Sequence, residues 1–205
     1  MHWVHSTINL YEPIDGAALL RKIEFAGRTC YRSFDKITTD ITNTEKFIAN
    51  AIQRGHESIL EHAYITFEVI CSRDVLAQWT RHRLASYSVE SQRYCNYTKD
   101  KFDGFTFIMP ENVTEDMELE IRQAISEDVE HYNNLIAMGA KPEQARAVLS
   151  NCTKTQFIWT ANIREIRHFI KLRTAVGAQP DIVKLATQLK DILIQNNLSV
   201  LVQDI

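Results

Sequence analysis

The densest group of chemically active side chains lies between residues 81 and 94. This segment reads RHRLASYSVESQRY and combines three arginines, one histidine and three serines with a single acid. Arginine offers a rigid fork of N–H donors that suits phosphate oxygens, and serine hydroxyls can satisfy the remaining oxygens. Arg81 and Arg83 have no acid nearby in sequence before Glu90, so an anion would relieve their mutual repulsion. The segment predicts a site for phosphorylated ligands, with a solvated edge strand as the alternative.

Composition narrows the kind of anion that this segment could bind. The chain has 205 residues, of which 45% are hydrophobic and 24% charged, so residues 1–205 are expected to form one globular domain with a core. Its formal net charge of −3 is unlike the basic excess of most nucleic-acid-binding domains. We therefore expect a small-molecule anion and no nucleic-acid partner.

Cysteine spacing and hydropathy indicate the compartment. The four cysteines lie far apart and form no Cys-x-x-Cys pair, so we expect reduced thiols with neither structural zinc nor a redox dithiol. The N-terminus lacks the pattern of a signal peptide, and no apolar run reaches membrane-spanning length. These features favour a cytoplasmic protein without a membrane partner.

Hydrophobic periodicity predicts a mixed order of strands and helices around the segment. The expected strands cover residues 3–11, 65–69, 104–109 and 153–160, and the expected helices cover 17–25, 42–55, 114–138 and 162–172, with others from 72, 142 and 180. Gly27 should close the first helix, a capping box at 42–45 should start the second, and Asn162 should cap a later one. Without regular strand-helix alternation, the order favours an α+β fold.

Several familiar active-site patterns are absent from the sequence. The segment GHESILEH, residues 55–62, fails the spacings of helical zinc motifs, because His56 and His62 are six residues apart. It is either a capped loop or a place where His56 and Ser58 meet a ligand. No glycine-rich phosphate loop or nucleophile elbow occurs, and Cys95 is expected to be inert. Residues 162–173 place basic side chains on one helical face, which is either solvated or bound to ligand.

The spacing of the arginine segment resembles the defining motif of the flavin-dependent thymidylate synthases. In that motif, Arg81-His82-Arg83 is followed after seven residues by Ser91 and then by Arg93-Tyr94. Further elements in the same order resemble the family: Gly55-His56-x-Ser58-x-x-Glu61-His62, Gln78-Trp79, Asn162-x-Arg164, Phe169, Leu172-Arg173 and Ala178-Gln179. The resemblance extends from Arg28 to Gln179.

This resemblance implies a fold, an activity and an assembly. The fold would be a single α+β domain with an antiparallel sheet flanked by long helices. The activity would be the reductive methylation of dUMP to dTMP in de novo dTMP biosynthesis, with 5,10-methylenetetrahydrofolate as carbon donor and NADPH as reductant through bound FAD. The assembly would be a homotetramer whose subunits share active sites.

The resemblance also implies residue roles. FAD would be bound by Ser58, Arg81, His82, Arg83, Asn162 and His168. The substrate dUMP would be bound by Gln78, Arg81, Ser91, Gln92, Arg93, Arg146 and Arg173. Catalytic roles fall to Arg173, His56 and Ser91, and no metal is implied. A guanidinium beside the uracil ring would stabilise the negative charge that develops there.

Three positions depart from the family pattern. The family often has Asn-Glu in place of Ser88-Val89, a serine in place of Cys30 and a histidine in place of Gly177. The contact at Val89 is affected most, because Glu90 would point to the opposite face of an extended strand. Two other functions are considered: a non-catalytic nucleotide- or RNA-binding module that uses residues 81–93, and a metal hydrolase built on His56 and His62.

Overall fold

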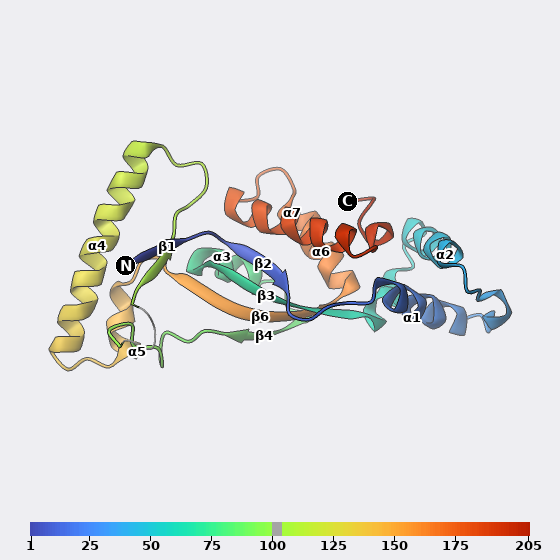
Figure 1. Ribbon diagram of the computed structural model, residues 1–205, viewed down its shortest axis with the longest axis horizontal. Helices are drawn as coiled ribbons and strands as arrows, with labels where there is room; N and C mark the ends of the chain where they lie inside the picture. The colour runs from blue at the N-terminus through green and yellow to red at the C-terminus, as the bar shows by residue number, and fades with distance from the viewer. Residues whose placement is uncertain (100–103) are drawn as a thin grey trace. The chain divides into compact units, whose positions relative to one another are not determined.

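The computed structural model describes residues 1–99 and 104–205 (Figure 1) and confirms the α+β fold class. The strands are β1 (His2–Val4), β2 (Thr7–Leu10), β3 (Tyr64–Ser72), β4 (Ala85–Val89), β5 (Thr106–Ile108) and β6 (Lys154–Asn162). The α-helices are α1 (Gly16–Thr29), α2 (Ile41–Gln53), α3 (Arg73–Trp79), α4 (Glu115–Ala137), α5 (Pro142–Ala145), α6 (Ile163–Arg173) and α7 (Pro180–Gln195). Short 3-10 helices are η1 (Phe34–Lys36), η2 (Glu57–His62), η4 (Arg146–Val148) and η5 (Ser199–Leu201).

The chain divides into two compact units. The first unit consists of Met1–Thr7, Val69–Arg81 and Ser88–Phe157. The second unit consists of Ile8–Glu68, His82–Tyr87 and Ile158–Ile205. The single domain over residues 1–205 stays a prediction.

Two sheets organise the strands. The larger sheet has the order β2-β3-β6-β4, and the smaller one pairs β1 with β5 in parallel, with His2 opposite Thr106. In the second unit, the hydroxyls of Thr66 and Thr160 lie 2.9 Å apart and the rings of Phe67 and Trp159 stack. Thr66 thus lies beside Thr160 and Phe67 beside Trp159, so residue numbers rise along β3 as they fall along β6 and the two strands are antiparallel.

The strands β3 and β6 share one plan. Both have nine residues with alternating burial, and each runs directly into a helix, α3 or α6. Asn162 caps α6 as predicted, because its side-chain oxygen accepts the N–H of Glu165 at 2.9 Å. Phe169 of α6 packs on Trp159 of β6 in the second unit, and Trp79 of α3 packs on Phe157 in the first. Each helix is therefore fixed against the apolar face of the strands.

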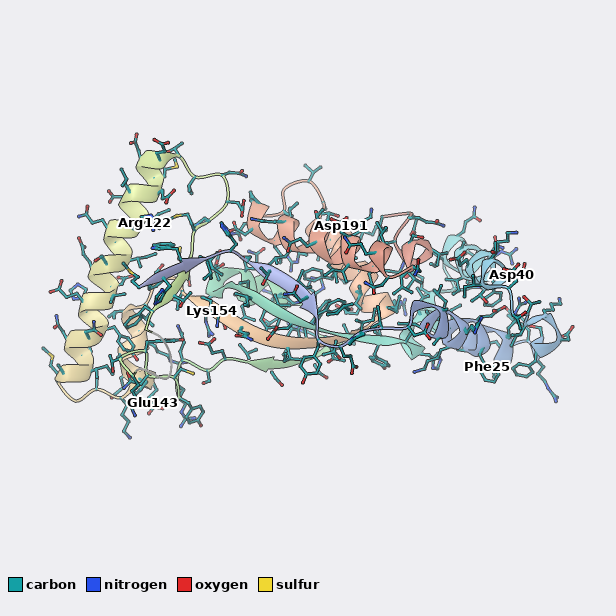
Figure 2. All side chains as sticks on the ribbon, in the orientation of Figure 1. Phe25, Asp40, Arg122, Glu143, Lys154 and Asp191 are labelled. Atoms are coloured by element: carbon teal, nitrogen blue, oxygen red, sulfur yellow. The ribbon has the colours of Figure 1, made fainter. Side chains whose placement is uncertain are left out.

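A core of aromatic and aliphatic side chains fills the first unit. The long helix α4 covers nearly the predicted residues 114–138. It begins after Thr114, whose hydroxyl accepts the N–H of Met117. Its buried side chains Ile125 and Tyr132 pack with residues that include Tyr97, Phe105, Phe107 and Ala145. Figure 2 shows the side chains of α4 and labels Arg122 on this helix. Arg122 stacks its guanidinium 4.2 Å from the ring of Trp3.

Two predicted helix boundaries are wrong for identifiable reasons. Gly27 does not end α1 but lies inside it, where an added Cβ would come 2.7 Å from the Phe47 ring. The glycine therefore allows close packing of α1 on α2. The second helix starts after Asp40, whose carboxylate accepts the N–H of Thr42. Thr42, the residue expected to cap this helix, therefore lies inside its first turn, and no capping box forms there. The hydroxyl of Thr44 donates to buried Glu24.

Three further predicted elements differ in detail. The strand expected at 3–11 is two strands, β1 and β2, which join different sheets. The helix α3 ends at Trp79, so Arg81 follows the helix and only Gln78 lies on it. The helix α5 ends at Ala145, and Arg146 begins the 3-10 turn η4.

Candidate active site

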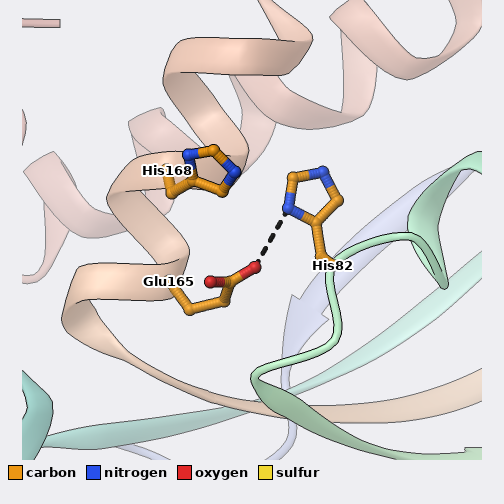
Figure 3. A group of neighbouring side chains, drawn as sticks. All are labelled: His82, Glu165 and His168. Carbon is orange, nitrogen blue, oxygen red and sulfur yellow. Dashed lines mark hydrogen bonds and ion pairs between the residues drawn. The ribbon is translucent and has the colours of Figure 1, made fainter.

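A buried histidine from the arginine segment contacts two side chains of α6 in the second unit. His82 has only 3% of its surface exposed, and its Nδ1 lies 3.1 Å from Oε1 of Glu165 (Figure 3). Its Nε2 accepts a hydrogen bond from Nε of Arg173, also at 3.1 Å. Glu165 lies in the first turn of α6 and Arg173 in its last. The helix thus places a carboxyl group at one nitrogen of the imidazole ring and a cationic guanidinium at the other.

These partners determine the protonation of the ring. An imidazole nitrogen that accepts from a guanidinium carries no proton, so the proton of neutral His82 is on Nδ1 and is donated to Glu165. Burial, followed by the electrostatic effects of Arg173 and His168, lowers the pKa of His82 to about 4. Burial also raises the pKa of Glu165, and His168 opposes that shift. His82 is therefore neutral at physiological pH.

The ring is also fixed by packing. Phe169 meets the His82 ring edge-on, with centroids 4.8 Å apart, and His168 lies at a tilted 5.3 Å. The hydroxyl of Tyr87 donates to the backbone carbonyl of His82 over 2.6 Å. Both the backbone and the side chain of His82 are thus held in one arrangement.

The group His82, Glu165 and His168 has the donor types of a metal site. One ligand atom from each residue lies within 4.8 Å of the others. However, both nitrogens of His82 have partners, and the cationic guanidinium of Arg173 at one of them opposes a metal cation. The arrangement functions better as a hydrogen-bonded chain than as a ligand set. That the protein holds no metal stays a prediction.

A basic cavity of about 840 Å³ lies in the second unit beside α1, α2 and η2. Its lining contains no acidic residue and includes these side chains: Arg28, Lys36, Arg54, His56, Ser58 and Arg164. Two of the cations have acidic partners outside the lining, since Arg28 pairs with Glu24 and Arg164 with Glu61. The cavity brings the predicted residues His56 and Ser58 together and suits an anionic ligand.

The short helix η2 that carries these residues is anchored by α6 and the C-terminal segment. Arg167 of α6 is buried, donates to Glu57 of η2 at 3.3 Å, and forms a two-pronged ion pair with Asp204 at 2.8 Å. His56 and Ser58 flank Glu57 in sequence. Residues 57–62 thus form a 3-10 helix, with His56 directly before it, rather than the capped loop considered from sequence.

The first unit holds the residues predicted to contact dUMP, with the exception of Arg173. Ser91 and Gln92 follow β4, where Gln92 is buried, and exposed Arg93 donates to Glu143 of α5 at 2.7 Å (Figure 2 labels Glu143). Arg93 thus lies against α5, the helix that ends just before Arg146. The acid that neutralises Arg93 comes from 50 residues away, which the local sequence does not reveal.

Glu90, the single acid of the arginine segment, points to other partners. Its carboxylate accepts from Lys154 at 2.8 Å and from the hydroxyl of Tyr97 at 3.1 Å in the first unit. It is therefore engaged in the packing of that unit and does not neutralise the two leading arginines. Within residues 1–99 and 104–205, the side chains of Arg81 and Arg83 are exposed and make no ion pair.

The structure divides the predicted site residues between the two units. His56, Ser58, His82, Arg83, Asn162, His168 and Arg173 lie in the second unit, and Gln78, Arg81, Ser91, Gln92, Arg93 and Arg146 lie in the first. Direct contact is seen for His82 with Arg173 and with His168. Sequence reasoning missed Glu165, because an acid in the first turn of a capped helix is ordinary.

Comparison with known proteins decides the family. A family model described as thymidylate synthase complementing protein matches residues 17–196. The flavin-dependent thymidylate synthase of Pyrococcus furiosus is 37% identical over 186 residues, which cover 89% of this chain and 74% of that protein. The chain belongs to the flavin-dependent thymidylate synthase family. The flavin-dependent thymidylate synthase of Geobacter sulfurreducens is 36% identical, with 82% and 74% of the two chains covered.

A solved structure agrees with the fold of this flavin-dependent thymidylate synthase family member. The crystal structure of thymidylate synthase X from Helicobacter pylori with FAD and dUMP superposes with a TM-score of 0.75 at 24% identity. The match covers 96% of each chain. In addition, no helix in the described parts of this chain is both long and apolar enough to cross a membrane.

Proposed function

We propose that this chain converts dUMP to dTMP by reductive methylation in de novo dTMP biosynthesis. A methylene group from 5,10-methylenetetrahydrofolate replaces the hydrogen on carbon 5 of uracil, and a hydride that originates from NADPH and passes through FAD completes the methyl group. The observation that carries the proposal is the hydrogen bond between His82 and Arg173. It joins the arginine segment to the C-terminal element that resembles the same family.

Arg173 is the residue that we assign to the uracil ring. A guanidinium near N3 and its neighbouring carbonyl stabilises the negative charge that must build up for carbon 5 to attack the methylene carbon. The hydrogen bond from its Nε to His82 fixes the plane of the fork, so that less freedom is lost when substrate binds. We assign dUMP contacts also to Gln78, Arg81, Ser91, Gln92, Arg93 and Arg146.

The basic cavity supports a role in cofactor binding. FAD carries a diphosphate and the folate carries carboxylates, so a lining with four Lys and Arg side chains and no acid matches their charge. We assign His56 and Ser58, which line it, to the flavin side of the reaction. FAD supplies the hydride when bound, and the protein's groups orient it and exclude water. The remaining flavin contacts are assigned to Arg81, His82, Arg83, Asn162 and His168.

The proposed assembly is a homotetramer whose subunits share active sites, in the cytoplasm and without nucleic acid. Exposed aromatic side chains support a protein interface, since Phe25, Tyr31 and Phe34 are 57%, 76% and 42% exposed. The rings of Phe25 and Phe34 lie 5.3 Å apart, and Tyr31 lines the basic cavity. Apolar surface of this kind is typical of contacts between chains.

The experiment measures flavin and turnover together. Purified protein should show flavin absorption bands, or gain them with added FAD, and should release tritium from 5-tritiated dUMP when the folate and NADPH are present. Protein that stays colourless with added FAD and releases no tritium would rule out the proposal.

A second candidate is a non-catalytic nucleotide- or RNA-binding module. The exposed side chains of Arg81 and Arg83, which form no ion pair with any residue that the structure describes, favour it, whereas the net charge of −3 opposes it. RNA affinity that falls steeply with salt, together with no flavin binding, would select this candidate instead.

A further inference from the structure

Glu165 is a buried carboxylate whose role no motif explains. Only 6% of its surface is exposed, and the group at hydrogen-bond distance from its Oε1 is His82, which is neutral. Burial of an acid costs free energy unless its hydrogen bonds compensate for lost water. A buried carboxyl group with this cost, next to the predicted site residues His82 and Arg173, is a candidate for a functional role.

We propose that Glu165 is a positioning residue that fixes the tautomer of His82 and thereby the orientation of Arg173. The inference rests on the proposed function for the role of Arg173 against uracil. Glu165 touches neither substrate nor cofactor in this role. It acts through His82 alone.

The hydrogen-bond directions carry the proposal. A carboxylate only accepts, so Glu165 holds the imidazole proton on Nδ1. Nε2 then has a lone pair that points at the Nε–H of Arg173. In the other tautomer, two N–H groups would face each other at 3.1 Å, and the bond that fixes the fork of Arg173 would be lost. The order of groups Glu-His-Arg therefore allows one arrangement only.

The surroundings leave Glu165 as the group that selects this tautomer. Among residues 1–99 and 104–205, the charged and titratable side chains recorded against His82 are Glu165, His168 and Arg173 of α6, together with Tyr87 of β4. Of these, Tyr87 donates to the backbone of His82, and the ring of His168 lies tilted against the His82 ring. Glu165 is the group among them that accepts at Nδ1.

The test is the Glu165→Gln variant. The amide keeps the shape but can present either its oxygen or its NH₂ group to Nδ1, so both tautomers of His82 become accessible. Replacing the carboxylate that orients a catalytic histidine by an amide is costly in serine proteases for this reason. Here we expect kcat for tritium release to fall about tenfold or more, with flavin occupancy and Tm close to the wild-type values. Glu165→Asp, which keeps the carboxylate, should lose less than Glu165→Gln.

The matched control is Glu118→Gln. Glu118 also lies in the first turn of a helix, α4, and its carboxylate also has a side-chain partner, Arg122. It belongs to the first unit and is not one of the predicted site residues. Its kcat should stay within about twofold of wild type. The control measures what a lost helical carboxylate does in general.

A double-mutant cycle with Arg173→Gln separates positioning from stability. If Glu165 acts through Arg173, then Glu165→Gln should change kcat and dUMP affinity by less than about twofold once Arg173 is already replaced. Calorimetric dUMP affinity keeps the cycle measurable if turnover becomes too slow. An equal loss in both backgrounds would overturn the proposal.

Histidine-selective ¹⁵N NMR tests the hydrogen bonds of His82 directly and does not require enzyme activity. Wild-type His82 should show a protonated Nδ1 and an unprotonated Nε2, whereas Glu165→Gln should show a mixture of tautomers. A wild-type spectrum with the proton on Nε2 would overturn the proposal directly. Inactive wild-type protein with the expected NMR signals would instead count against the proposed function and leave the tautomer result standing.

Discussion

The Nε–H of Arg173 donates to Nε2 of His82 over 3.1 Å, which ties the last turn of α6 to the arginine segment. The two residues are separated by 91 positions in sequence. His82 is buried and Arg173 is half-buried, so the bond is sheltered from water and has a strong directional effect. The arginine segment is therefore joined to α6 through its buried histidine.

Arg173→Ala should remove most of the turnover and leave the fold and the bound flavin in place. Loss of a cation that stabilises charge in the transition state lowers kcat by about 100-fold or more. Tritium release, the flavin spectrum and circular dichroism measure the three quantities. Arg21→Ala is the control, because Arg21 is an exposed residue of α1 that donates to the carbonyl of Thr39. Equal loss of flavin from Arg173→Ala would reassign this residue to cofactor binding or structure.

Arg81→Ala should release FAD before it affects the fold. Arg81 is exposed and has no acidic partner in the described structure, so its removal disrupts no ion pair there. The ratio of flavin to protein absorbance after gel filtration gives the occupancy. Full occupancy in this variant would remove Arg81 from the flavin site.

Much of the architecture follows from local sequence patterns. The alternation of Ile65 and Phe67 predicts one buried strand face, and the helical stripe from 114 to 138 predicts α4 almost to its ends. The cap at Asn162 was predictable because its bond to Glu165 spans only three residues. Short-range hydrogen bonds and periodicity are encoded within a few residues of sequence.

The contacts that build the site are not local. His82 and Glu165 are 83 positions apart, so no spacing rule could pair them. Gly27 is typical of a helix end, and only its position beside Phe47 of α2 explains why it lies inside α1. The capping box expected at 42–45 is absent because Asp40 caps the helix, and Thr44 inside this segment bonds to Glu24, 20 positions away. Such pairings depend on how helices pack, which propensity alone does not determine.

His82 should titrate far below an ordinary histidine. Burial and then the charge of Arg173 lower its pKa from 6.5 to about 4. The unfolded chain therefore binds a proton between these pH values that the folded chain does not, and this group lowers stability as pH falls from about 6.5 to 4. The raised pKa of Glu165 has the opposite sign, since the folded state then takes up that proton more readily.

Arg173→Gln gives the test of this electrostatic account. Removal of the guanidinium should raise the pKa of His82 toward the usual value without restoring it, because burial is the larger cause. Histidine-selective NMR titration of the two proteins measures the change. If the pKa of His82 were unchanged in Arg173→Gln, the charge of Arg173 would have no effect on the protonation of the His82 ring.

Asp204→Asn should destabilise the second unit and make its stability less dependent on acid. Buried Arg167 would lose its two-pronged partner and keep its bonds to Glu57 and to the carbonyl of Leu201, at a cost of roughly 1–3 kcal/mol in the free energy of unfolding. The hydrogen bonds and charge of Arg167 lower the pKa of Asp204, so its stabilisation is present above the ordinary carboxyl pKa of 3.8 and is lost as pH falls through the lowered value.

Denaturant unfolding of wild-type and Asp204→Asn protein at neutral pH and in acid measures this coupling. The difference between the two proteins should be largest at neutral pH and should shrink in acid, where Asp204 of the wild type is protonated. Asp191→Asn is the control, because Asp191 is an exposed carboxylate on α7, labelled in Figure 2. A difference of the same size at both pH values would assign the effect to lost packing. Arg167 also bonds to Glu57, which lies between His56 and Ser58, the residues assigned to the flavin. A destabilised Asp204→Asn protein should therefore lose flavin at a lower temperature than wild type.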